Sequence, residues 1–203
     1  MGADSVPTDA APTPRRFTIT DVRALTAFAH PLRLRLLHHL IRTGPNTASR
    51  CAEALGDSAS NCSYHLRLLS RHGLVERAEP ESDADGRDRP WRAVATGFDF
   101  LPDTNDPESQ SAHAALVGVE LAELMRLFRA FLAHFDTLDE TWQRASSFHT
   151  YALSATPDEL AHLTAVFDLL VRPYIITERT SPPAGAREVS VSLQAILRPQ
   201  EPR

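Results

Sequence analysis

Residues 47–77 read TASRCAEALGDSASNCSYHLRLLSRHGLVER, and this segment carries the signals of two short helices. Thr47 belongs to a residue type that caps helix N-termini, and small and apolar residues on one face continue a helix over residues 48–55. Gly56 follows where the chain has to turn. The segment therefore begins with one short helix and a glycine turn.

A second helix follows this turn. Ser58 or Ser60 can cap it, and it runs to about His72. Gly73 comes directly afterwards, in the position where helices often take a left-handed residue. Two helices joined by a short turn that contains glycine are typical of a helix-turn-helix.

The flanking residues complete a larger unit. Upstream, Thr20 or Asp21 can cap a first helix, and a second helix is predicted over residues 31–42. Downstream, residues 74–77 and 91–95 predict two paired strands. A core of short helices followed by a β-hairpin is a winged helix.

Three stretches match the sequence pattern of a known family. They are AHPLRLRLLHHL at 29–40, RCAEALGDSASNCSYHLRLLSRHGLVER at 50–77 and GRDRPWRAV at 86–94. Over residues 17–98 the chain resembles the ArsR-like winged-helix transcription regulators, in particular their actinobacterial branch with an added C-terminal region. The resemblance implies a homodimer that binds double-stranded DNA.

The second helix of the helix-turn-helix has a core face and a polar face. Cys62, Leu66 and Leu69 recur at spacings of four and three, so we expect them to face the core. The opposite face carries six candidate DNA-binding residues, namely Ser60, Asn61, Ser63, Tyr64, Arg67 and Arg71. Arg can pair with guanine, Asn with adenine, and Ser or Tyr with phosphate. The alternative to DNA binding is a polar face that only contacts solvent. His65 lies near the buried stripe and is predicted as a packed core histidine.

The loop between the two strands carries further arginines. Arg87 and Arg89 resemble wing-tip residues that enter the minor groove. Five carboxylates accompany them, namely Glu79, Glu81, Asp83, Asp85 and Asp88. Because these carboxylates repel phosphate, a mobile acidic loop is the alternative to a DNA contact.

The charge of the chain is unevenly distributed. The 203 residues have a formal net charge of −5, and all 21 basic residues are Arg. Between Arg15 and Arg77, 10 Arg and 4 acidic residues give a local charge of +6. A basic block within an acidic chain favours one surface that meets a polyanion, with a solvated Arg-rich surface as the alternative.

Since neither a secretory signal nor a membrane-length apolar run is present, we expect a soluble, cytoplasmic protein associated with the nucleoid, with no membrane partner.

No catalytic residue, cofactor or metal site is predicted. Cys51 and Cys62 take inward positions as small core residues, whereas metal-sensing members of the family that the chain resembles use a paired-cysteine motif. No nucleophile–His–acid arrangement and no phosphate-binding glycine loop is visible. We therefore do not expect an enzyme.

A long helix is predicted over residues 109–146, which contain no proline. Apolar residues repeat along it at alternating spacings of four and three, and the predicted dimer seam is Val117, Leu121, Leu124, Phe128, Phe131, Phe135, Leu138 and Trp142. This repeat is typical of a helix packed along another helix. A core helix is the alternative, but about 37 residues at 1.5 Å each give about 55 Å, longer than one small domain covers. The seam therefore predicts a homodimer.

Residues 147–198 predict a small strand-helix-strand lobe. Residues 148–153 and 189–195 alternate as strands, and Thr156-Pro157-Asp158-Glu159 begins a helix with a capping box. Together with the aromatic residues of the seam, this lobe can hold a small apolar effector. In the alternative interpretation, those aromatic residues form only the dimer core.

The predicted fold class is mainly α (α+β). The predicted layout is a disordered tail at 1–16, a winged helix-turn-helix DNA-binding domain at 17–98, a linker at 99–108, and a dimerisation helix with an effector or sensor region at 109–203. We expect a homodimeric, sequence-specific transcription regulator on an inverted-repeat operator. The alternative function, favoured by the acidic wing and the net charge, is a winged-helix protein-interaction module of the antitoxin or co-regulator kind.

Overall fold

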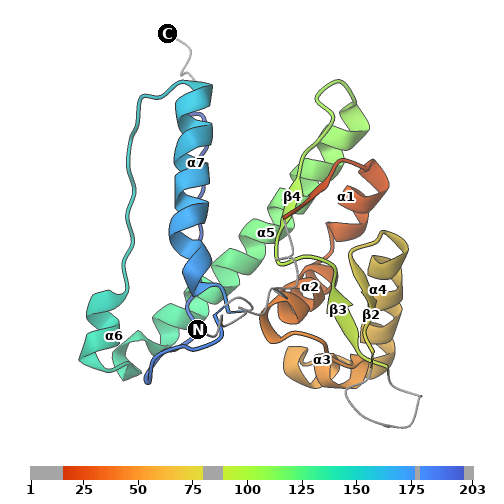
Figure 1. The fold of residues 1–203 in the computed structure, drawn as a ribbon. Helices are drawn as coiled ribbons and strands as arrows, with labels where there is room; N and C mark the ends of the chain where they lie inside the picture. The colour runs from red at the N-terminus through yellow and green to blue at the C-terminus, as the bar shows by residue number, and fades with distance from the viewer. Residues whose placement is uncertain (1–15, 80–88, 177–178, 199–203) are drawn as a thin grey trace, which may run out of the picture. The chain divides into compact units, whose positions relative to one another are not determined.

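The structure is a computed structural model, and it describes residues 16–79, 89–176 and 179–198 (Figure 1). The chain divides into two compact units, residues 1–137 and 138–203, and each is described by itself. Helices dominate both units, and the described strands are short, so the mainly α (α+β) fold class is confirmed. Residues 1–15 of the predicted tail lie outside the described residues.

Four short helices build the centre of the first unit, namely α1 (Val22–Phe28), α2 (Pro31–Thr43), α3 (Ala48–Leu55) and α4 (Ala59–Arg71). Three of them begin at predicted caps, because Asp21, Thr47 and Ser58 each accept a hydrogen bond from a backbone N–H in the first turn. Gly56 (φ 67°) and Gly73 (φ 70°) end α3 and α4 in the left-handed region, which glycine enters without strain. Helices α3 and α4 thus form the predicted helix-turn-helix.

A hairpin follows α4, as predicted. Strands β2 (Val75–Arg77) and β3 (Trp91–Ala93) pair antiparallel. On its other edge, β3 meets the loop before α3, because the N–H and C=O groups of Asn46 and Trp91 bond to each other at 2.8 and 2.7 Å. The hairpin is therefore tied to the helix-turn-helix on both sides.

A second pair of strands, which the sequence patterns do not predict, joins the two ends of the winged helix. Strand β1 (Phe17–Ile19) pairs in parallel with β4 (Phe98–Phe100), most of which falls in the segment predicted as a linker. The Arg16 guanidinium holds the Asp99 carboxylate through Nε and Nη2 at 2.8 and 2.6 Å. The ring of Phe28 packs against that of Phe100, with centroids 4.8 Å apart. These contacts close the unit around α1.

The core of the first unit also draws on the next helix, α5 (Pro107–His134). Its fully buried side chains come mainly from α1, α2 and α4, and include Leu25, Phe28, Leu34, Leu36, Leu37, Leu40, Leu66 and Leu69. Ala112 and Leu116 of α5 belong to the same cluster. The first half of α5 therefore packs onto α1 and α2 as part of the winged helix.

The prediction of a single helix to residue 146 is wrong. Helix α5 ends at His134 and passes into a 3₁₀ turn, η1 (Phe135–Thr137), after which α6 spans Glu140–Ala145. Asp139 caps α6 in extended backbone (φ −64°, ψ 154°), and its carboxylate accepts a hydrogen bond from the Trp142 N–H. A cap residue cannot continue the preceding helix. The unbroken seam therefore ends at Phe135, and Leu138 and Trp142 belong to the second unit.

The second unit contains α6, α7 (Pro157–Val171) and a 3₁₀ turn, η2 (Arg172–Tyr174). Helix α7 begins with the predicted capping box between Thr156 and Glu159. The strands predicted over 148–153 and 189–195 are not formed, and this part of the prediction is wrong. A strand needs a neighbour for its N–H and C=O groups, and an alternating pattern alone does not supply one.

Candidate nucleic-acid interface

Helix α4 presents one face to the core and one to the solvent. Cys62, Leu66 and Leu69 are fully buried, as their spacing predicts. Of the six predicted DNA-binding residues on this helix, five are exposed and Ser63 is half-buried. Ser58 fixes where the helix begins, because its Oγ accepts a hydrogen bond from the Asn61 N–H at 3.2 Å. The structure thus brings the six residues together on the outer side of α4.

Asn61 is engaged by a local contact. Its Nδ2 donates to Oδ1 of Asp57 at 2.9 Å, and the Ser58 N–H donates to the same oxygen at 2.7 Å. These two hydrogen bonds lower the pKa of the Asp57 carboxyl from its ordinary value, and the bond from Asn61 makes the larger contribution. To pair with adenine, the Asn61 amide therefore has to turn away from Asp57.

Arg67 and Arg71 are the two cations of the outer face and lie one helical turn apart. Both are exposed, and neither has a hydrogen bond or an ion pair with the part of the chain that the structure describes. Tyr64 lies beside them, 57% exposed, with its ring edge-on to His65. Guanidinium groups placed in this way can donate to guanine or to phosphate.

The arginines of the hairpin mostly contact the hairpin itself. Arg77 lies over the Trp91 ring, 3.8 Å from its centroid, and Arg92 pairs with Glu76 across the strands at 2.7 Å. Of the two predicted wing residues, Arg89 is exposed in the loop two residues before β3, and Arg87 lies outside the described residues. Arg77 and Arg92 therefore stabilise the hairpin.

His65 is buried beneath the outer face, which confirms its prediction as a packed histidine. Its ring packs at a tilt against that of His30, with centroids 4.6 Å apart, and its Nδ1 has no hydrogen-bond partner among the described residues. His30 in turn caps α2, because its Nδ1 accepts a hydrogen bond from the Leu32 N–H at 3.2 Å. Burial lowers the pKa of both imidazoles, and nearby positive charge lowers it further by a smaller amount.

The sequence patterns do not predict that two further residues lie next to α4. His30 reaches His65 from the loop before α2, and Arg33, in the first turn of α2, lies near enough to lower the pKa of both histidines. The only sequence signal for Arg33 is the basic block between Arg15 and Arg77. The contacts join residues that are far apart in the sequence, so no local pattern reveals them.

The α5 seam, which we define as the predicted seam residues from Val117 to Phe135, turns away from the core of the first unit. None of its six residues is buried, whereas Ala112 and Leu116 on another side of α5 are. Val117 and Leu121 are 40% and 48% exposed. Within the described residues, the buried core of the first unit does not include this apolar face.

Both cysteines are core residues, as predicted. Cys51 and Cys62 are fully buried, and burial raises the pKa of the Cys62 thiol, with a smaller contribution from Asp57. In the part of the chain that the structure describes, no group of three or more His, Cys, Asp or Glu residues is placed to hold a metal ion.

Comparison with known proteins finds one family match in the first unit. Residues 28–78 match the family model of a helix-turn-helix domain. Among the solved structures, a protein from Mycobacterium tuberculosis, RV1404, is 12% identical with a TM-score of 0.31, and the match covers 80% of this chain and 85% of that one. The heme sensor protein PefR from Streptococcus agalactiae, solved with heme, is 13% identical with a TM-score of 0.30, over 78% and 86% of the two chains. No curated protein matches the sequence.

The helix-turn-helix match coincides with α2, α3, α4 and β2, and it supports a winged helix-turn-helix regulator as the class of protein. At TM-scores below 0.5, the two solved structures assign neither the fold nor the function of this chain. No described helix is both long and apolar enough to cross a membrane.

Proposed function

We propose that this protein is a sequence-specific, DNA-binding transcription regulator of the ArsR-like kind, which binds an inverted-repeat operator as a homodimer in the cytoplasm. It is not an enzyme and needs no cofactor for DNA binding. The observation that carries the proposal is the outer face of α4, where Arg67 and Arg71 have no partner within the described chain, next to a glycine turn that is typical of helix-turn-helix domains.

The chemistry of this face fits the major groove. In helix-turn-helix proteins the N-terminal residues of the second helix contact base edges, which favours Ser60, Asn61, Ser63 and Tyr64 for this role. Arg67 and Arg71 follow on the same face and supply charge-assisted hydrogen bonds. We propose that the wing contacts the adjacent minor groove through Arg87 and Arg89.

The α5 seam supports the dimer. It is a heptad-spaced apolar face outside the buried core of the first unit, with Val117 and Leu121 exposed and its other residues half-buried. A second copy of α5 is its natural complement. Leu138 and Trp142 are proposed as separate dimer contacts of the second unit, because the helix break at Asp139 takes them out of the α5 seam. A small-molecule effector is proposed to modulate DNA binding.

The experiment selects binding sites from a pool of random duplex DNA and then measures affinity for the selected site and for a scrambled one at several salt concentrations. We expect an inverted repeat whose half-sites lie one helical turn, about 34 Å, or a multiple of it apart. Equal, weak affinity for both duplexes contradicts the proposal. The protein-interaction module, which the acidic wing and the net charge favour, then takes its place.

A further inference from the structure

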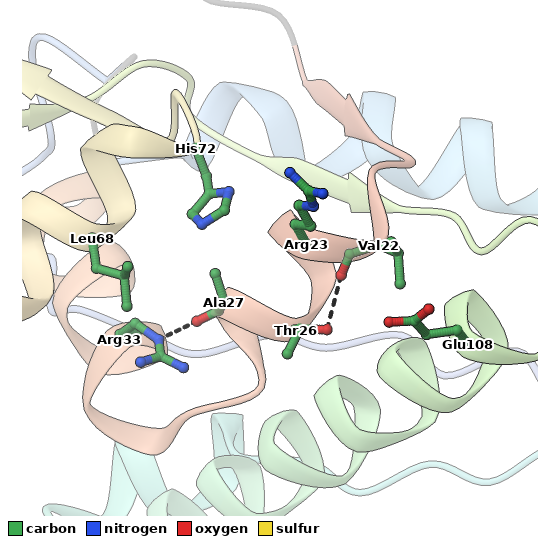
Figure 2. A pocket seen from close by; sticks show the side chains of 8 residues that line it. All are labelled: Val22, Arg23, Thr26, Ala27, Arg33, Leu68, His72 and Glu108. Carbon is green, nitrogen blue, oxygen red and sulfur yellow. Dashed lines mark hydrogen bonds between the residues drawn. The ribbon is translucent and has the colours of Figure 1, made fainter.

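A cavity of about 380 Å³ opens on the flank of α4 within the first unit. Its walls come from α1, from the first turn of α2, from the end of α4 and from the first turn of α5. Figure 2 shows Arg23, Arg33 and His72 arranged around Ala27, with Glu108 across from Arg33. Pockets of this volume are large enough for a small organic molecule.

Two arginines line the cavity, and neither forms an ion pair with the described part of the chain. Arg33 is half-buried, its Nε donates to the Ala27 carbonyl, and no acidic side chain of the described chain forms an ion pair with it. Burial lowers the pKa of Arg33, and the nearby Tyr64 has a smaller, opposite effect. Arg23 is exposed at the rim and likewise has no hydrogen bond or ion pair with described residues. An anion bound in the cavity would supply the counter-ion that these guanidinium groups lack among the described residues.

The remaining walls restrict the kind of anion. Leu68, Ala27 and Val22 give the cavity an apolar side, and the hydroxyl of Thr26 already donates to the Val22 carbonyl at 2.9 Å. Glu108, on the opposite rim, repels a second negative charge at that end. The walls therefore fit a ligand with one negative group and an apolar body.

We propose that this cavity is a binding site for a small organic carboxylate, with its charged group held by Arg23 and Arg33 and by a hydrogen bond from the His72 imidazole. A carboxylate matches the planar fork of a guanidinium group. A phosphate of bound DNA is the other source of such an anion. However, Leu68 and His72 lie about 100° around α4 from Arg67 and Arg71, since each residue advances the helix by about 100°. The cavity therefore opens beside the proposed DNA-binding face.

The test uses isothermal titration calorimetry on the full-length protein without DNA. Benzoate is the probe, and benzamide, which has the same shape but no charge, is the control. Benzoate is expected to bind saturably at millimolar concentration or below, and benzamide is not. Arg33→Gln and Arg23→Gln are each expected to weaken benzoate binding about tenfold, the loss typical of one charge-assisted hydrogen bond. Arg42→Gln removes the same charge from the exposed end of α2, outside the cavity, and is expected to leave the affinity within about twofold of wild type.

Several outcomes overturn the inference. No saturable binding of benzoate, equal binding of benzamide, or an equal affinity in all variants each removes the site. Arg33→Gln also loses the bond to Ala27, so circular dichroism must show native folding; Arg23→Gln, which breaks no described bond, tests the site independently of folding. In a parallel DNA titration, loss of affinity on all sequences in both variants, without benzoate binding, assigns the two arginines to DNA phosphate. Because benzoate is titrated without DNA, the site and the proposed function can fail separately.

Discussion

Arg67 and Asn61 lie on the same helix but differ in what they offer to DNA. Arg67 has no partner in the described chain, whereas the Asn61 amide donates to Asp57. Arg67 carries a charge that releases counter-ions when it meets phosphate, and Asn61 carries none. The two substitutions therefore separate contacts with bases from contacts with the backbone.

Arg67→Ala is expected to cost about 1–3 kcal/mol on the selected DNA site and to relax the preference at one base position per half-site, if the guanidinium pairs with guanine. Asn61→Ala is expected to lower specificity without changing the salt dependence. Both are measured by titration on selected and scrambled DNA at several salt concentrations. A uniform loss on both DNAs, with the salt slope of Arg67→Ala reduced by about one unit per protomer, shows a phosphate contact instead.

We expect the packed pair His30 and His65 to make stability sensitive to acid. Their pKa values are lowered in the folded protein, so the unfolded chain binds protons more readily, and stability falls as the pH drops below the ordinary imidazole value of 6.5. Around the pair, Arg33 opposes protonation, and Asp57 favours it at His65. We expect the free energy of unfolding to decrease from about pH 7 to about pH 5.

Urea unfolding at a series of pH values measures this effect. His65→Gln is expected to flatten the decrease, and so is His30→Asn, in which the amide can still cap α2. His113→Gln, which changes a half-buried histidine of α5 outside the pair, serves as the control. An unchanged pH profile in both variants of the pair contradicts the role assigned to it.

At the scale of elements, the start of α4 depends on one serine. Ser58 and Ser60 are both plausible caps in the sequence, and the structure gives that role to Ser58. Ser58→Ala is expected to lower the free energy of unfolding by about 1 kcal/mol, because the Asn61 N–H loses its acceptor. Ser60→Ala, on an exposed position after the cap, is expected to change it by less than about 0.5 kcal/mol. Similar losses in chemical denaturation contradict the assignment.

Local signals in the sequence predict the elements of the winged helix well. Caps and turns depend on a few neighbouring residues. Thr47 and Gly56 are found where expected, and Asp21 and Ser58 are each one of the two caps that the sequence offers. The same holds for the division of α4 into a core face and an outer face, from which the candidate DNA-binding residues follow. Their contacts with DNA stay a prediction.

Features that depend on distant partners are not predictable in this way. Phe17 pairs with Phe98 across most of the domain, and neither residue carries a local strand signal strong enough to show it. The heptad spacing continues past Asp139, but spacing does not show that this carboxylate caps a new helix. Residues 148–153 alternate as a strand would, yet they have no neighbour to pair with. The cavity beside α4 is likewise formed by four separate elements.

At the scale of the whole molecule, assembly depends on the α5 seam. Phe131→Asp places a charge in the middle of this apolar face and is expected to give monomer or aggregate, because burying an unpaired carboxylate costs several kcal/mol. Ala133→Asp puts the same charge about 200° away, on an exposed position of α5, and is expected to leave a dimer. Multi-angle light scattering measures both. A monomeric wild type at micromolar concentration shows that the seam does not join two copies.

The pairing of β1 with β4 and the burial of Leu116 determine how small a fragment can be cut from this chain and still fold on its own. A fragment that stops at residue 98 loses the last strand and the three buried residues of α5, and burying Leu116 alone is worth about 1.5–3 kcal/mol. A fragment of residues 16–119 keeps both. We expect the longer fragment to unfold cooperatively on heating and the shorter one to lack a transition, so the autonomous folding module extends into the helix that also carries the seam.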